Sequence, residues 1–90
     1  MSADPRDEIM RMTALKFFPK VDAVTVGLAP NPYAIFTKGT VKCEVRIPDA
    51  VPLDDFEAEA WFAFRHLARA LDMNDVAEHP VDQIVIDVEQ

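Results

Sequence analysis

The sequence predicts an α+β fold whose elements follow the order α-β-β-β-α-β. Apolar residues recur at helical spacing in two segments and alternate with polar residues in four shorter ones. None of the seven prolines falls in the interior of these segments, as suits a residue that lacks an amide proton and fixes φ. The 90 residues are expected to form a single domain, 1–90, because independent domains usually hold about 50–200 residues.

The first helix is predicted over residues 5–18. Asp4 precedes it as an N-cap, and Pro5 suits the first helical position. Pro19 ends the helix, since proline cannot continue it. Helical spacing gives the helix one buried face, formed by Ile9, Met10, Thr13 and Phe17.

Three strands are predicted next, over residues 20–28, 33–37 and 40–47. The first is rich in β-branched residues, which favour strands. The third has the clearest pattern, because apolar and polar residues alternate strictly along it, so one face is buried and the other is wet. The buried face of this third strand carries Val41, Cys43, Val45 and Ile47.

The turn between the second and third strands decides which residues share a face. With a two-residue loop at 38–39, Phe36 faces Val41, while Tyr33 and Ile35 lie on the open face. A bulged three-residue loop would shift the register by one and reverse the faces. Both registers are compatible with the sequence.

A long second helix is predicted over residues 54–73 and a last strand over 81–89. Asp54 and Glu57 have the spacing of a capping box at the helix start. A right-handed crossover would place the last strand parallel to the third, at the edge of the sheet, with both helices on the apolar face of the antiparallel meander. The core stripe of this helix is predicted to be Phe56, Ala60, Ala63, Phe64, Leu67 and Leu71.

A second group of residues on this helix is the first candidate contact surface. Phe62 falls nearly opposite the core stripe, and Trp61 falls on its flank. Aromatic and Arg side chains dominate protein–protein binding, because they bury much area with few rotamers lost. The predicted surface is Trp61, Phe62, Arg65 and Arg69, with Tyr33 and Ile35 of the open sheet face as a second patch. The alternative is that the first helix covers Trp61 and leaves Phe62 as a single exposed apolar residue.

The charge is divided unevenly along the chain. The formal net charge is −7; residues 1–47 carry seven Lys or Arg against five Asp or Glu, and residues 48–90 carry two against eleven. A net negative charge weighs against a protein that binds the phosphates of nucleic acids. The acidic residues either keep the protein soluble or form an acidic surface for a basic partner. The candidates for such a surface are Asp54, Asp55, Glu57, Glu59, Asp72, Asp75 and Glu78.

Two comparisons with nucleic-acid biology follow from the order and the charge. The first five elements resemble double-stranded RNA-binding domains in order, which implies lysines at the start of the last helix. Asp54, Asp55 and Glu57 stand there, so direct nucleic-acid binding is not expected. The acidity is instead similar to that of phage inhibitors whose carboxylates replace phosphates in a nucleic-acid channel, an analogy of size and charge alone.

Catalytic and metal chemistry are not predicted. Cys43 could act as a nucleophile with His66 or His79 as its base, but its alternation points it into the core, where cysteine behaves as a small apolar residue. Two distant histidines without paired cysteines give no zinc spacing. The segment 73–78 lacks the glycine of a calcium loop. No cofactor is therefore expected.

The predicted location is the cytoplasm. No signal-peptide pattern opens the sequence, and the longest uncharged stretch, 23–37, contains two prolines and falls short of the ~20 apolar residues of a membrane-spanning helix. A single cysteine suits a reducing compartment. The sequence thus predicts a non-catalytic acidic protein that binds another protein, as an inhibitor, an adaptor or a small subunit, with a second copy of itself among the candidate partners. A nucleic-acid mimic that blocks a host defence enzyme is the alternative.

Overall fold

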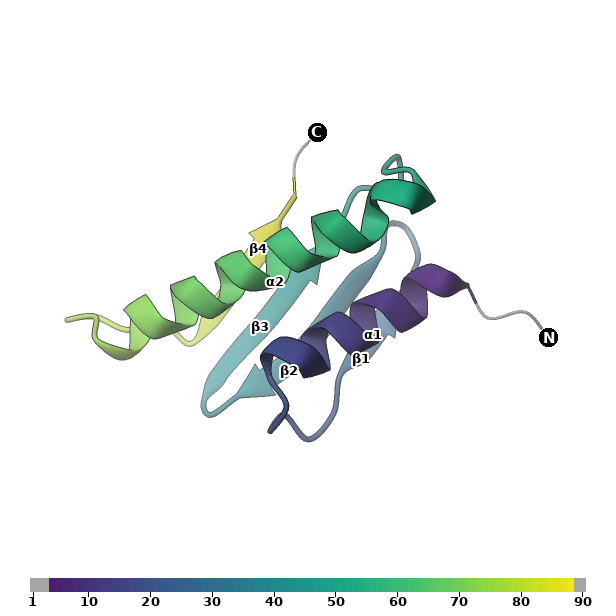
Figure 1. Ribbon diagram of the computed structural model, residues 1–90. Helices are drawn as coiled ribbons and strands as arrows, with labels where there is room; N and C mark the ends of the chain where they lie inside the picture. Colours follow the sequence, from purple (N-terminus) through teal and green to yellow (C-terminus); the bar gives the residue numbers. More distant parts are fainter. Residues whose placement is uncertain (1–3, 89–90) are drawn as a thin grey trace.

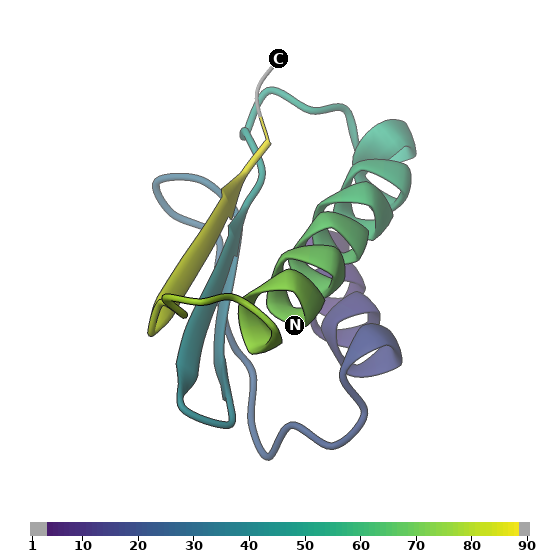
Figure 2. The same ribbon diagram turned by 90° about the vertical axis from the view of Figure 1, so that its left-hand side faces the viewer.

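Two helices pack on one face of a four-stranded mixed sheet in the computed structural model, which describes residues 4–88 (Figure 1). Turned by 90°, the molecule has both helices on one side of the sheet and no helix on the other (Figure 2). The predicted order and the predicted α+β class are confirmed. The elements are α1 (Pro5–Phe17), β1 (Thr25–Gly27), β2 (Tyr33–Lys38), β3 (Val41–Arg46), α2 (Leu53–Asp75) and β4 (Gln83–Asp87).

The sheet has the strand order β1-β2-β3-β4. Its first three strands form the predicted antiparallel meander, and β4 pairs in parallel with β3. The chain between β3 and β4 contains α2, which crosses the sheet and returns the chain to its starting end. This connection leaves β4 at the edge of the sheet, as predicted.

The core lies between the helices and the sheet. The six residues predicted as the apolar stripe of α2 are its buried residues. Met10 of α1 and Cys43, Val45 and Ile47 of the third-strand region are fully buried against them. Ile84, Ile86 and Val88 pack more loosely on the margin of this core. Burial of apolar area on one face of the sheet supplies most of the driving force for this arrangement.

The start of α1 follows the sequence closely. The Asp4 carboxylate accepts a hydrogen bond from the Arg6 backbone N–H at 2.9 Å, so the predicted N-cap is confirmed. The Arg6 guanidinium also binds this carboxylate at 2.9 Å and the Asp49 carboxylate at 2.8 Å. Hydrogen bonding from the Arg6 side chain, and then from its backbone N–H, lowers the pKa of Asp4. These contacts fasten the start of α1 to the loop before α2.

The hairpin register differs from the one predicted with a two-residue loop at 38–39. Lys38 pairs with Val41, so the loop is Gly39 and Thr40, and Phe36 faces Cys43 rather than Val41. Gly39 has φ +62°, and a glycine with positive φ at the first loop position is typical of a type II′ turn. The shift is two residues, so the side chains keep the predicted faces.

The start of α2 was predicted wrongly in detail. The helix begins at Leu53, its N-cap is Pro52, and no side chain caps it. Asp54 therefore lies inside the first turn and cannot act as the cap of a capping box. Asp54 and Asp55 still favour the positive end of the helix dipole there.

Three strands are shorter than predicted, and of these β3 spans Val41–Arg46 rather than 40–47. The first spans three residues rather than 20–28, because the chain turns after α1, where the Val21 N–H donates to the Phe18 carbonyl at 3.2 Å. The last spans Gln83–Asp87, and the predicted end at Glu89 lies outside the described residues. α1 ends one residue before the predicted Phe18.

Candidate interaction surface

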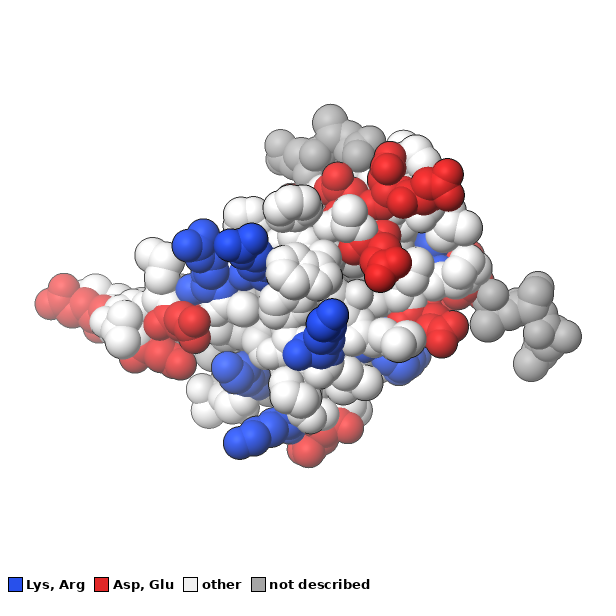
Figure 3. Space-filling view, viewed as in Figure 1, with Lys and Arg blue, Asp and Glu red and all other residues white. Residues whose placement is uncertain are grey.

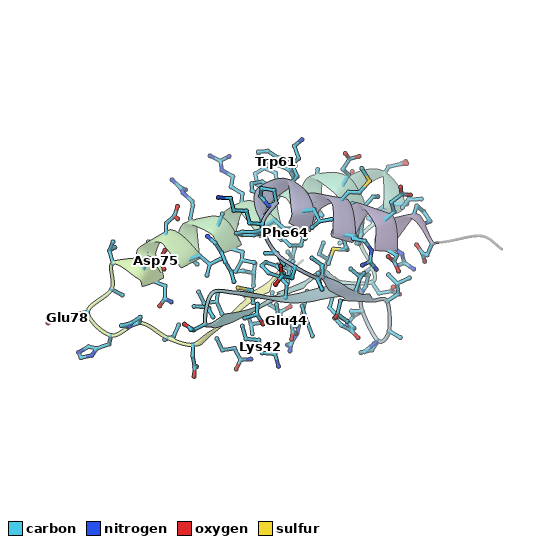
Figure 4. The ribbon with its side chains drawn as sticks, turned by 90° about the horizontal axis from the view of Figure 1, so that it is seen from below. Lys42, Glu44, Trp61, Phe64, Asp75 and Glu78 are labelled. Carbon is cyan, nitrogen blue, oxygen red and sulfur yellow. The ribbon has the colours of Figure 1, made fainter. Side chains whose placement is uncertain are left out.

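The outer side of α2 presents two aromatic side chains that the core stripe does not need. Trp61 is 40% exposed and Phe62 is 55% exposed. The Phe17 ring of α1 meets Trp61 edge-on, with the ring centres 5.0 Å apart and the planes at 69°. Figure 4 shows Trp61 on the outer side of the helical layer and Phe64 between the layers. α1 thus covers part of Trp61, while Phe62 stays open.

Two arginines extend this surface along the helix. Arg65 and Arg69 follow Trp61 at steps of four residues, so all three lie along one side of α2. Both arginines are exposed, and neither forms an ion pair within residues 4–88. Their charges are therefore available to a carboxylate on another molecule.

Phe62 also borders the edge of the sheet. It lines a shallow hollow of about 400 Å³ between α2 and β4, together with His66 from the helix and Val85, Ile86 and Val88 from the strand region. This hollow could not be predicted from the sequence, since it depends on the distance between α2 and the edge strand. Alternation along β4 indicated only that Val85 faces away from the residues that pack on the core.

Tyr33 and Ile35 lie on the opposite side of the molecule from Trp61. Both are half-buried on the face of the sheet that has no helix. The Tyr33 ring lies across Gly27 of the neighbouring strand, so closely that a Cβ on this glycine would stand 2.3 Å from the ring carbon Cζ. The structure therefore keeps the two predicted patches apart on opposite faces.

Charged residues share this open face with Tyr33 and Ile35. Glu44 forms an ion pair with Arg46, and the Arg46 Nη1 lies 3.9 Å from the Asp87 Oδ2. The Glu44 side chain is only 14% exposed. An open hollow of about 550 Å³ is bordered by Tyr33 and Ile35 and by the charged residues Glu44, Arg46 and Asp87. Figure 4 shows Lys42 and Glu44 directed away from the helices.

The predicted acidic surface is divided into two groups. Asp54, Asp55, Glu57 and Glu59 lie near the start of α2, and Asp72, Asp75 and Glu78 lie at and beyond its far end. The nearest members, Glu59 and Asp72, are thirteen positions apart along the helix, or about 20 Å. Arg65 and Arg69 stand between them, and Figure 3 shows Asp and Glu toward the two ends of α2 with Lys and Arg near its middle.

The cysteine and the histidines are not brought together. Cys43 is fully buried, and its thiol donates to the Val41 carbonyl at 3.6 Å. Burial raises the pKa of this thiol. His66 lies in the hollow beside Phe62, and His79 is exposed in the loop before β4. No hydrogen bond joins Cys43 to either histidine in the part of the chain that the structure describes.

Between residues 4 and 88, no three His, Cys, Asp or Glu side chains are grouped as metal ligands would be. No helix in this range has the length and apolar character needed to cross a membrane. No protein-family model, curated protein or solved structure matches the chain.

Proposed function

We propose that the protein acts without catalysis, by binding another protein through the outer side of α2. The observation that carries the proposal is the exposure of Trp61 and Phe62 on a helix whose own apolar stripe is already fully buried. Two large aromatic side chains beyond the needs of the core leave apolar area in water, and covering it on association is favourable.

The surface favours a partner of particular chemistry. Arg65 and Arg69 lie beside the aromatic residues without an ion pair among residues 4–88. Arg presents a planar fork that binds carboxylates at two points. The proposed partner therefore offers an apolar recess for the aromatic rings and acidic residues at its rim. An inhibitor, an adaptor or a small subunit of an assembly would all use such a surface.

The test is binding to a partner recovered from the native cell and identified by mass spectrometry. Phe62→Glu places a charge at the centre of the proposed contact and is expected to weaken the affinity at least tenfold, because charges are disfavoured at interface centres. The matched control is Val76→Glu, which adds the same charge at a residue that is 85% exposed beyond the end of α2. Circular dichroism checks that both variants fold.

The alternative of nucleic-acid mimicry has a different outcome in the same assay. Mimicry requires binding that is lost in half-molar salt and in variants such as Asp54→Asn and Asp72→Asn, because it depends on exposed charges. Binding through the outer side of α2 survives these changes and fails in Phe62→Glu. Unchanged affinity in Phe62→Glu would reject the proposed contact.

A further inference from the structure

The outer edge of β4 carries backbone groups that the sheet does not use. The Lys42 N–H donates to the Asp82 carbonyl at 2.9 Å, and the Val88 N–H donates to the Arg46 carbonyl at 3.0 Å. Residues of a parallel strand alternate in the direction of their backbone groups, so the even-numbered residues 82–88 face β3. The N–H and C=O groups of Gln83, Val85 and Asp87 therefore point outward.

This edge is the more accessible of the two edges of the sheet. The opposite edge, β1, spans three residues, and the Arg11 guanidinium already donates to the Val24 carbonyl beside it at 2.9 Å. β4 spans five residues, and within residues 4–88 no strand pairs with its outer side. It contains neither proline nor lysine, the residues that commonly protect an edge strand from pairing.

We propose that β4 pairs antiparallel with β4 of a second copy of this chain, around a two-fold axis at Val85. This register places Val85 opposite Val85 and Gln83 opposite Asp87, so no carboxylate faces a carboxylate. The outward backbone groups of all three residues then bond across the axis in both directions, because hydrogen-bonded pairs recur every second residue in an antiparallel ladder.

Registers in which the axis moves toward the end of the strand are poorer. Moving the axis to residue 86 pairs Val85 with Asp87 and leaves Gln83 without a partner in the strand. Moving it to Asp87 sets two carboxylates directly opposite each other, which is destabilising. The strand is therefore complementary to its own reversed copy at Val85, and this argues for a second copy rather than an unrelated strand.

The hollow beside the edge is consistent with this pairing. Ile84 of the second copy would lie opposite Ile86, on the side of the sheet where Phe62 and His66 line the hollow. Half-exposed apolar residues of both copies would lose water there. The contact is separate from the outer side of α2 that the proposed function uses, although Phe62 borders both surfaces. The variants that test this pairing therefore keep Phe62.

The test uses opposite charges on the axis. Val85→Lys and Val85→Glu each set like charges opposite each other and are expected to weaken the homodimer at least tenfold in sedimentation equilibrium. An equimolar mixture of the two variants sets Lys opposite Glu and is expected to restore dimers, seen as the heterodimer mass by native mass spectrometry. Thr25→Lys and Thr25→Glu, at the exposed first residue of β1, are the matched controls and should leave dimerisation unchanged.

A measurement on the unmodified chain keeps the proposal testable if a variant fails to fold. Amide exchange at Val85 and Asp87 should slow as the protein concentration rises, while exchange at Ile84 and Ile86 should depend on it much less. A wild-type chain that stays monomeric up to about 1 mM overturns the proposal, as does a mixture that remains monomeric although both variants fold. If Val85→Lys leaves the affinity for the partner protein unchanged, binding through the outer side of α2 does not depend on the homodimer.

Discussion

Tyr33 and Gly27 face each other across β1 and β2, and the tyrosine ring occupies the space where a side chain at residue 27 would stand. Alternation placed Tyr33 on the open face of the sheet even though the predicted register was wrong, because side-chain direction repeats every two residues. The partner could not be predicted, since β1 was expected to be far longer. The close approach of the Tyr33 ring to Gly27 depends on the pairing of β1 with β2, which the sequence pattern does not report.

Gly27→Ala should destabilise the protein through the Tyr33 ring. The added Cβ would lie 2.3 Å from Cζ, so the ring must move, at a cost of about 1–3 kcal/mol in the free energy of unfolding. In a Tyr33→Ala background the same change should be neutral or stabilising by up to about 1 kcal/mol, because it restricts the unfolded chain. Urea unfolding of the four proteins measures this cycle, and equal effects in both backgrounds would contradict the contact.

The buried thiol of Cys43 is expected to make the free energy of unfolding decline at alkaline pH. Burial raises the pKa of the folded thiol above its ordinary value of 9.0. Its contribution to stability is therefore fully present below that ordinary value and is lost as pH rises through the folded pKa. The free energy of unfolding should decline more steeply above pH 9 in the wild type than in Cys43→Ala. Parallel curves for the two proteins would show that the thiol is accessible.

At the scale of elements, α2 was predicted well on its buried side, whereas the residue that caps its start was predicted wrongly. Its buried residues follow from helical period alone, because that stripe has to cover the sheet. The cap was missed because the segment before Asp54 enters the helix one residue earlier, through Pro52. The hollow between α2 and β4 was missed because periodicity gives the face of a helix and not its distance from a strand.

Two phenylalanines of α2 should differ sharply in their contribution to stability. Phe64 is fully buried and Phe62 is 55% exposed. Phe64→Ala is expected to lower the free energy of unfolding by about 3–5 kcal/mol, and Phe62→Ala to change it by no more than about 0.5 kcal/mol. Chemical denaturation of dilute protein measures both. A large loss in Phe62→Ala under these conditions would mean that the monomer itself covers this ring.

At the scale of the whole molecule, the positions of the charged residues on the surface could not be predicted from their numbers in the two halves of the chain. The second half of the chain is strongly acidic, yet the carboxylates of α2 lie toward its two ends, and Arg65 and Arg69 lie between them in the helix. Figure 3 shows the red groups toward the ends of α2 and blue groups near its middle. The element order and the one-sided helical layer could be predicted, because proline positions and apolar periods fix both. Ion pairs such as that of Arg6 with Asp49 bring together residues 43 positions apart, and no local pattern reports them.

The parallel placement of β4 has a consequence for how the chain acquires its structure. The β2–β3 hairpin closes over two loop residues and needs little loss of chain freedom, whereas β4 pairs with β3 across a long connection that contains the whole of α2. Closing longer loops costs more entropy and slows folding. The fourth strand is therefore expected to join last and to detach first, which makes this margin of the sheet the natural starting point of unfolding.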